Sequence, residues 1–209
     1  MKRKAGIICM SLGTVLIIGA LSLFLFNRYQ EKNAGESVEE LMPQLLEYIE
    51  NIDPNATEPP TYAQPVGTPV EFLDPSAFHM TEVEIDGYGY IGYLTIPRLD
   101  LKLPVMADWD YRRLQIAPCR YVGSVRGEDL VLMAHNYDRH FGRISQLEAG
   151  DSVVFVDMDG KKTVYSVVGQ DVLMPTAVEE MTAGEYDLTL FTCTYGGRTR
   201  VSVYCDRMD

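Results

Sequence analysis

A chain of 209 residues with 46% hydrophobic and 23% charged residues has the composition of a folded protein, which excludes disorder along its whole length. That length allows one domain of ordinary size with appended segments. Beyond residue 32 the chain carries 29 acidic and 13 basic side chains, within a total net charge of −12. So acidic a chain repels phosphate groups, and we therefore expect no nucleic-acid partner.

The N-terminus combines a basic cluster with a long uncharged run. Residues 1–4 carry three basic side chains, and residues 5–26 carry no charge. At about 1.5 Å per helical residue this run spans about 33 Å, enough to cross a bilayer. Residues 27–30 do not provide the small-residue cleavage site of a signal peptide. The pattern predicts a single-pass membrane anchor at 5–26, with residues 1–4 cytoplasmic and the remaining chain extracytoplasmic.

Residues 27–80 are predicted to form an extracytoplasmic helix followed by a proline-rich stalk. A short helix is expected over 35–52, because Ser37 and Glu40 have capping-box spacing and the apolar residues that follow share one face. Residues 53–75 then contain six prolines, a density typical of an extended spacer.

Residues 81–209 show short apolar or alternating runs separated by Gly and Asp, a pattern that predicts strands. The expected strands cover 90–96, 99–105, 130–134, 152–156, 163–168, 188–193 and 201–205. The sequence at 157–160, Asp-Met-Asp-Gly, predicts a tight hairpin turn, and short helices are expected at 108–114 and 177–181. Seven or eight short strands without strand–helix alternation predict an all-β domain, a closed or nearly closed β-barrel with short helices.

Cys193 is the candidate nucleophile. It ends the apolar run 188–193, and a Gly-rich turn follows, so a strand would hold its backbone while the sulfur lies at the open end. Nucleophilic attack near neutral pH needs a nearby base or cation, because an unperturbed thiol has a pKa of about 8.5. His135 also directly follows an apolar run, 130–134, and can supply that base.

Two arginines, Arg198 and Arg200, follow the Gly-Gly turn that returns the last strand to the side of Cys193. A guanidinium at this position would hydrogen-bond a developing oxyanion or orient a substrate carbonyl. Strand alternation puts both arginines on one face, so position alone leaves the choice between them open.

These runs resemble the signatures of the sortase family. The run 188–193, Leu-Thr-Leu-Phe-Thr-Cys, with an arginine at the start of the final strand, is similar to the family's Thr-Leu-x-Thr-Cys motif. The run 132–136, Leu-Met-Ala-His-Asn, is similar to the family's histidine motif, and 91–97 resembles its opening strands. The resemblance covers about residues 83–209 and includes the membrane anchor.

The resemblance implies a cysteine transpeptidase of the thiol protease class that needs no cofactor and no metal. Cys193 would attack an LPXTG-like sorting motif near the C-terminus of a secreted protein, and His135 would protonate the departing amine. Arg200 would steady the oxyanion; it is preferred because the family arginine stands against the apolar residues of the last strand. An amine of a peptidoglycan precursor or a pilin would then resolve the thioester, as in the anchoring of Gram-positive surface proteins; water would give hydrolysis.

The sortase class stays open, because the segment 169–187 is short for a class B sortase. Asp74-Pro75 is similar to the lid motif of pilin-building sortases, but Ser76 replaces its aromatic residue and a plain turn is favoured. Three cysteines lie outside the predicted membrane span, so at least one is unpaired. A disulfide between Cys119 and Cys205 is one of the arrangements that the sequence allows.

Two other enzyme families fit the cysteine less well. An L,D-transpeptidase would have a His-Gly pair just before Cys193 and an arginine two residues after it, and neither occurs. A papain-like peptidase would have its cysteine before its histidine and at the start of a helix. The non-enzymatic alternative is a membrane-anchored β-domain that binds a surface partner; it predicts that no thioacyl adduct forms on Cys193.

Overall fold

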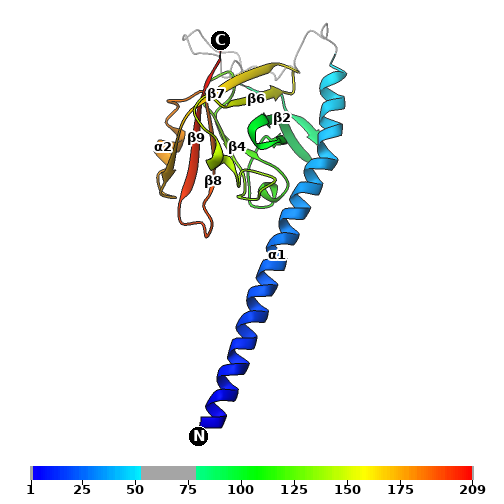
Figure 1. Cartoon of the computed structure of the whole chain (residues 1–209). Helices are drawn as coiled ribbons and strands as arrows, with labels where there is room; N and C mark the ends of the chain where they lie inside the picture. The colour runs from blue at the N-terminus through cyan, green and yellow to red at the C-terminus, as the bar shows by residue number, and fades with distance from the viewer. Residues whose placement is uncertain (1, 53–78, 209) are drawn as a thin grey trace, which may run out of the picture.

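The computed structural model describes residues 2–52 and 79–208. Helix α1 spans Lys2–Glu50 without a break. Figure 1 shows its C-terminal part lying along a β-barrel and its N-terminal part running on alone. An 18-residue stretch of this helix has a mean hydropathy of 1.9 and is not buried at all, so α1 is long and apolar enough to span a membrane.

Residues 35–50 are helical as expected, but they continue α1, so the expected helix start near residue 35 is wrong. Ser37 does not cap a helix; its hydroxyl donates to the carbonyl of Asn33, one turn back inside α1, at 3.0 Å. Two ion pairs at i,i+3 and i,i+4 spacing stabilise helical conformation within residues 28–36, where the prediction had placed a break. Capping-box spacing can occur in the middle of a helix, and here it does.

The C-terminal part of α1 packs against the barrel. Ala34, Leu41 and Leu45 are buried, and the two leucines join an apolar cluster with side chains of the barrel. The helical part of the predicted helix-and-stalk segment therefore lies on the domain and is no spacer. The proline-rich remainder, which includes Asp74-Pro75, falls in residues 53–78 and lies outside the described residues.

Nine strands occur in the described part of the chain: β1 Val83–Ile85, β2 Tyr88–Ile96, β3 Leu101–Met106, β4 Cys119–Val122, β5 Leu130–Met133, β6 Ser152–Asp157, β7 Lys162–Leu173, β8 Leu188–Cys193 and β9 Arg200–Arg207. All seven predicted strands are present, whereas β1 and β4 were not predicted. The short helix expected at 177–181 is confirmed as α2, Val178–Thr182. The helix expected at 108–114 is only a 3-10 turn, Arg113–Gln115.

The strands form one sheet in the order β1-β2-β3-β4-β5-β8-β9-β7-β6, and β2 also pairs with β6. Strands β2 to β9 therefore close into a barrel of eight strands, and β1 extends the sheet beside β2. The pairs β3–β4 and β5–β8 are parallel, and the remaining neighbours are antiparallel. The predicted closed all-β barrel is confirmed.

Alternation along the strands decides which side chains face the core. Leu130 and Leu132 of β5 and Leu190 of β8 are fully buried inside the barrel. Val131 and Phe191 alternate with them and pack on the outer face with Met181 of α2. A register slip of one residue would turn the core side chains to the outside, so burial fixes which face each strand end presents.

The predicted turn at 157–160 is confirmed between β6 and β7. Gly160 adopts φ 74°, which a glycine tolerates without strain. The buried Asp157 carboxylate accepts the backbone N–H groups of Asp159 and Lys161 at 3.0 and 2.8 Å. These two hydrogen bonds from backbone groups of the turn to the Asp157 side chain stabilise the turn.

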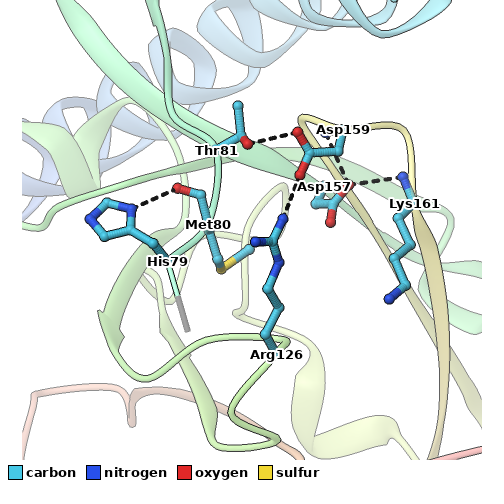
Figure 2. Close-up of polar contacts among 7 residues, drawn as sticks. All are labelled: His79, Met80, Thr81, Arg126, Asp157, Asp159 and Lys161. Atoms are coloured by element: carbon cyan, nitrogen blue, oxygen red, sulfur yellow. Dashed lines mark hydrogen bonds and ion pairs between the residues drawn. The ribbon is translucent and has the colours of Figure 1, made fainter. Parts of the chain in front are cut away.

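The same turn fastens two other segments to this end of the barrel. The Asp159 carboxylate accepts the Thr81 hydroxyl at 2.6 Å and the Arg126 guanidinium at 2.7 Å (Figure 2). A side chain at Gly160 would lie 3.6 Å from Ile49, so the turn lies beside the C-terminal end of α1.

Cys119 and Cys205 do not form the disulfide that the sequence allowed. Both are free, buried thiols, and they belong to two different apolar clusters. Burial raises the pKa of each to about 12, so both remain protonated and pack as small apolar side chains.

Candidate active site

Parallel pairing of β5 with β8 brings His135 beside Cys193. Met133 and Phe191 are partners in the ladder, and His135 and Cys193 each lie two residues further on. Cys193, the last residue of β8, shares the outer face with Phe191, and His135 lies just beyond the end of β5. The Thr192 hydroxyl donates to the carbonyl of Ala134 at 2.8 Å, and this bond ties the two strand ends together.

Antiparallel pairing of β8 with β9 brings Arg200 to the same place. Cys193 and Arg200 are direct partners in the ladder, so their side chains are cross-strand neighbours on one face. The Arg200 Nη1 donates to the carbonyls of Gly197 and Thr199, both at 3.1 Å. Its other N–H groups have no hydrogen-bond partner within the described chain and are free for a ligand.

Arg198 lies in the turn before β9 and is exposed. The expectation that strand alternation puts both arginines on one face was therefore wrong, because β9 begins only at Arg200. The turn ends where the Thr194 amide donates to the carbonyl of Thr199 at 3.0 Å. Of the two arginines, Arg200 alone has a ladder position opposite Cys193.

The His135 imidazole is half-buried, and this burial lowers its pKa. Its ring centroid lies 5.0 Å from that of Tyr137, which in turn lies 5.6 Å from that of the fully buried His140. The backbone N–H of Phe141 donates to the carbonyl of His135 at 3.2 Å and folds the loop back. His135 is thus held in a compact loop of aromatic side chains.

A packed apolar cluster lies on the outer face of the barrel, two residues before Cys193. Phe191, two residues before Cys193, packs with Val131 and with Met181 of α2. Its ring also meets the Tyr121 ring edge-on at 5.4 Å, and Tyr121 lies 5.5 Å from the ring of the partly exposed Trp109. An open pocket of about 430 Å³ is lined in part by these last two residues. Asp108 and Arg120 also line this pocket, so its lining combines charged and aromatic side chains.

A thiol, an imidazole and a guanidinium at adjacent strand ends form the set of groups that acyl transfer requires: a nucleophile, a base and an oxyanion donor. Within the described residues no group of three or more His, Cys, Asp and Glu is placed to hold a metal ion.

Comparison with known protein families gives one match. The Sortase domain, as a sequence family, matches residues 94–208, more than half of the chain. The chain belongs to the sortase family. This finding confirms the resemblance seen in the two sequence motifs.

Several solved sortase structures are similar to this protein. Sortase A from Corynebacterium diphtheriae is 22% identical with a TM-score of 0.54, covering 58% of this chain and 62% of that one, and shows the fold. Sortase C1 from Streptococcus suis is 28% identical with a TM-score of 0.50, covering 57% and 73%. Sortase C1 from Streptococcus agalactiae, in complex with MTSET, is 26% identical with a TM-score of 0.50, covering 57% and 68%. This chain thus spans less than two thirds of the first of these proteins, and no curated protein sequence matches it.

Two residues near the site were not singled out from the sequence. Thr192 had a signal, since a hydroxyl in a buried apolar strand requires a hydrogen-bond partner. Tyr137 had none, because its contact with His135 arises from the path of an irregular loop.

Proposed function

We propose that this sortase is a membrane-anchored cysteine transpeptidase in which Cys193, His135 and Arg200 act together. The observation that supports the proposal is the register of β5, β8 and β9: Arg200 is the ladder partner of Cys193, and His135 follows the end of β5, where Met133 pairs with Phe191. His135 comes from a segment far from Cys193 in the sequence, and structural roles for the two residues would not require their strand ends to be neighbours.

The first step is acyl transfer to the thiol. Burial lowers the pKa of His135, so its imidazole is neutral near pH 7 and can accept the proton of the Cys193 thiol. The thiolate attacks the scissile carbonyl carbon, and the negative charge moves to the carbonyl oxygen, where Arg200 donates to it. The C–N bond then breaks, the imidazolium of His135 gives its proton to the departing amine, and a thioester on Cys193 remains.

The second step resolves the thioester. An incoming amine attacks the carbonyl carbon and loses a proton to His135, while Cys193 leaves and regains its proton. The product is a new amide bond, and water in place of the amine gives hydrolysis. The substrate is a secreted protein with an LPXTG-like sorting motif, and the acceptor is an amine of a peptidoglycan precursor or a pilin.

The anchor suits substrates at a membrane surface. The uncharged run ends at Phe26, and Ala34, eight residues later, is already buried against the barrel. Eight helical residues extend about 12 Å, so the domain would lie close to the bilayer. With the basic residues 1–4 in the cytoplasm, the site faces the extracytoplasmic side, where a sorting signal retained in the membrane is presented.

The test uses the full chain in lipid nanodiscs with a library of LPXTG-like peptides and triglycine as the amine. We expect cleavage and joining of a subset of peptides, and we expect Cys193→Ala to abolish both. Cys119→Ala is the matched control, since this buried thiol lies outside the site and its loss should leave turnover in place. Turnover retained in Cys193→Ala would refute the assignment, and binding without turnover in the unaltered protein would favour the non-catalytic alternative.

A further inference from the structure

One stripe of α1 lies against the loop that carries His135. Ala34 and Gly35 are buried, and Val38 packs on the main core of the barrel. Glu39, one turn beyond Gly35, places its Oε1 2.7 Å from Nη1 of Arg139 in that loop. These positions share a helical face. Any side chain at Gly35 would overlap the Cδ atom of Arg139, so the helix and the loop are in direct contact.

The loop that contacts α1 at Arg139 is compact and begins only four residues earlier, at His135. The backbone N–H groups of His140 and Gly142 both donate to the carbonyl of Tyr137 at 2.9 Å, which makes the segment compact. The Tyr137 ring lies against His135. Burial raises the pKa of the Tyr137 hydroxyl, and the negative charge of Glu31 on α1 raises it further. The helix therefore faces the loop at both Tyr137 and Arg139.

We propose that the extracytoplasmic part of α1 positions His135, by fixing the loop at Arg139 and holding Tyr137 against the imidazole. The proposal rests on the proposed acid–base role of His135. Reaction rates are sensitive to the placement of a catalytic group, with a shift of about 1 Å costing up to about 100-fold. The membrane helix is then part of the working site as well as its tether.

A charge-swap cycle tests this contact in the full chain in nanodiscs. Glu39→Arg and Arg139→Glu each place like charges face to face, and we expect each to lower kcat about fivefold, as suits an exposed pair. KM for the peptide should change less than about twofold, because neither residue lines the pocket at Trp109 and Tyr121. The double variant restores the pair and should restore kcat. Glu148→Arg is the matched control, since Glu148 forms an exposed 2.7 Å ion pair with Arg98 elsewhere.

Tyr137 gives a second, independent test. Tyr137→Phe keeps the ring and should retain kcat, whereas Tyr137→Ala should lower it about tenfold at unchanged KM. The imidazole resonances of His135, followed by NMR of histidine-labelled protein, should shift in Tyr137→Ala and in Glu39→Arg and return in the charge-swapped double variant.

Unaltered kcat and unaltered His135 resonances in the single variants would overturn the positioning role. A loss of kcat in the single variants that the double variant does not restore would also overturn it. The NMR readout needs no turnover, so it decides this proposal even if the chain proves inactive. Inactivity of the unaltered protein, or activity of Cys193→Ala, would count against the proposed function instead.

Discussion

The hydrogen bond between Thr192 and Ala134 offers a direct perturbation of the site's framework. Thr192 is 4% exposed, and its hydroxyl donates to the Ala134 carbonyl at 2.8 Å across the ends of β8 and β5. Thr192→Val preserves the shape of the side chain but leaves that carbonyl without this donor. Loss of one partner of a buried hydrogen bond costs about 1 to 2 kcal/mol of unfolding free energy.

For a barrel of this size the loss corresponds to a fall in Tm of about 3 to 10 °C. Because the bond joins the strand ends that carry His135 and Cys193, we also expect kcat/KM to fall about tenfold under conditions where the variant is fully folded. Urea unfolding followed by tyrosine fluorescence gives the first quantity, and peptide turnover at 20 °C gives the second.

Thr189→Val provides the matched control on the same strand. Thr189 is 5% exposed, and its hydroxyl forms no hydrogen bond with any described residue, so the substitution should change stability by less than about 0.5 kcal/mol. Equal unfolding free energies for Thr192→Val and the unaltered protein would show that this hydrogen bond does not stabilise the fold as expected. A loss of stability with unchanged turnover would show that the bond does not align the site.

Three further predictions concern the arginines, the buried histidine and the anchor. Arg200→Ala should lower kcat/KM about 100-fold with the fold intact, and Arg198→Ala less than about threefold; the reverse order would contradict the ladder argument. Burial, followed by the charge of His135, lowers the pKa of His140 to about 4, below about 6.5 in the unfolded chain. The unfolded state therefore binds more protons below pH 6.5, and the unfolding free energy should fall by up to about 3 kcal/mol between pH 6.5 and 4. Urea unfolding across this range should show a shallower decline for His140→Phe, and equal declines would contradict the assignment. Seven helical residues inserted after Arg28 would raise the domain by about 10 Å and should slow turnover of a membrane-anchored substrate while sparing a soluble peptide; equal effects on both substrates would exclude a role for the height of the site.

The strands of the barrel were predictable because short apolar or alternating runs are local signals. Runs such as 188–193 and 130–134 carry their own pattern, and the turn at 157–160 has its own Asp-Gly signal. Strand β4, Cys119–Val122, was missed because four residues with no clear alternation become a strand only through their neighbours. The continuity of α1 was missed because the Ser37 spacing mimics a helix start that nothing else supports.

The candidate site was predictable in part for the same reason. The sequence shows that Cys193 ends one apolar run and that His135 directly follows another. It does not show that the two runs are neighbours, because this depends on the parallel pairing of β5 with β8. The distinction between Arg198 and Arg200 depends on where the turn closes. The contact of Arg139 with α1 is tertiary, and no pattern along the chain indicates it.

The most direct test of the account is intact-protein mass spectrometry of the full chain incubated with an LPXTG-like peptide in the absence of an amine. The account predicts a mass increase equal to the acyl portion of the peptide, located on Cys193 after digestion, released by hydroxylamine and absent in Cys193→Ala. Peptide cleavage with an adduct on another residue, or with the same adduct in Cys193→Ala, would contradict it.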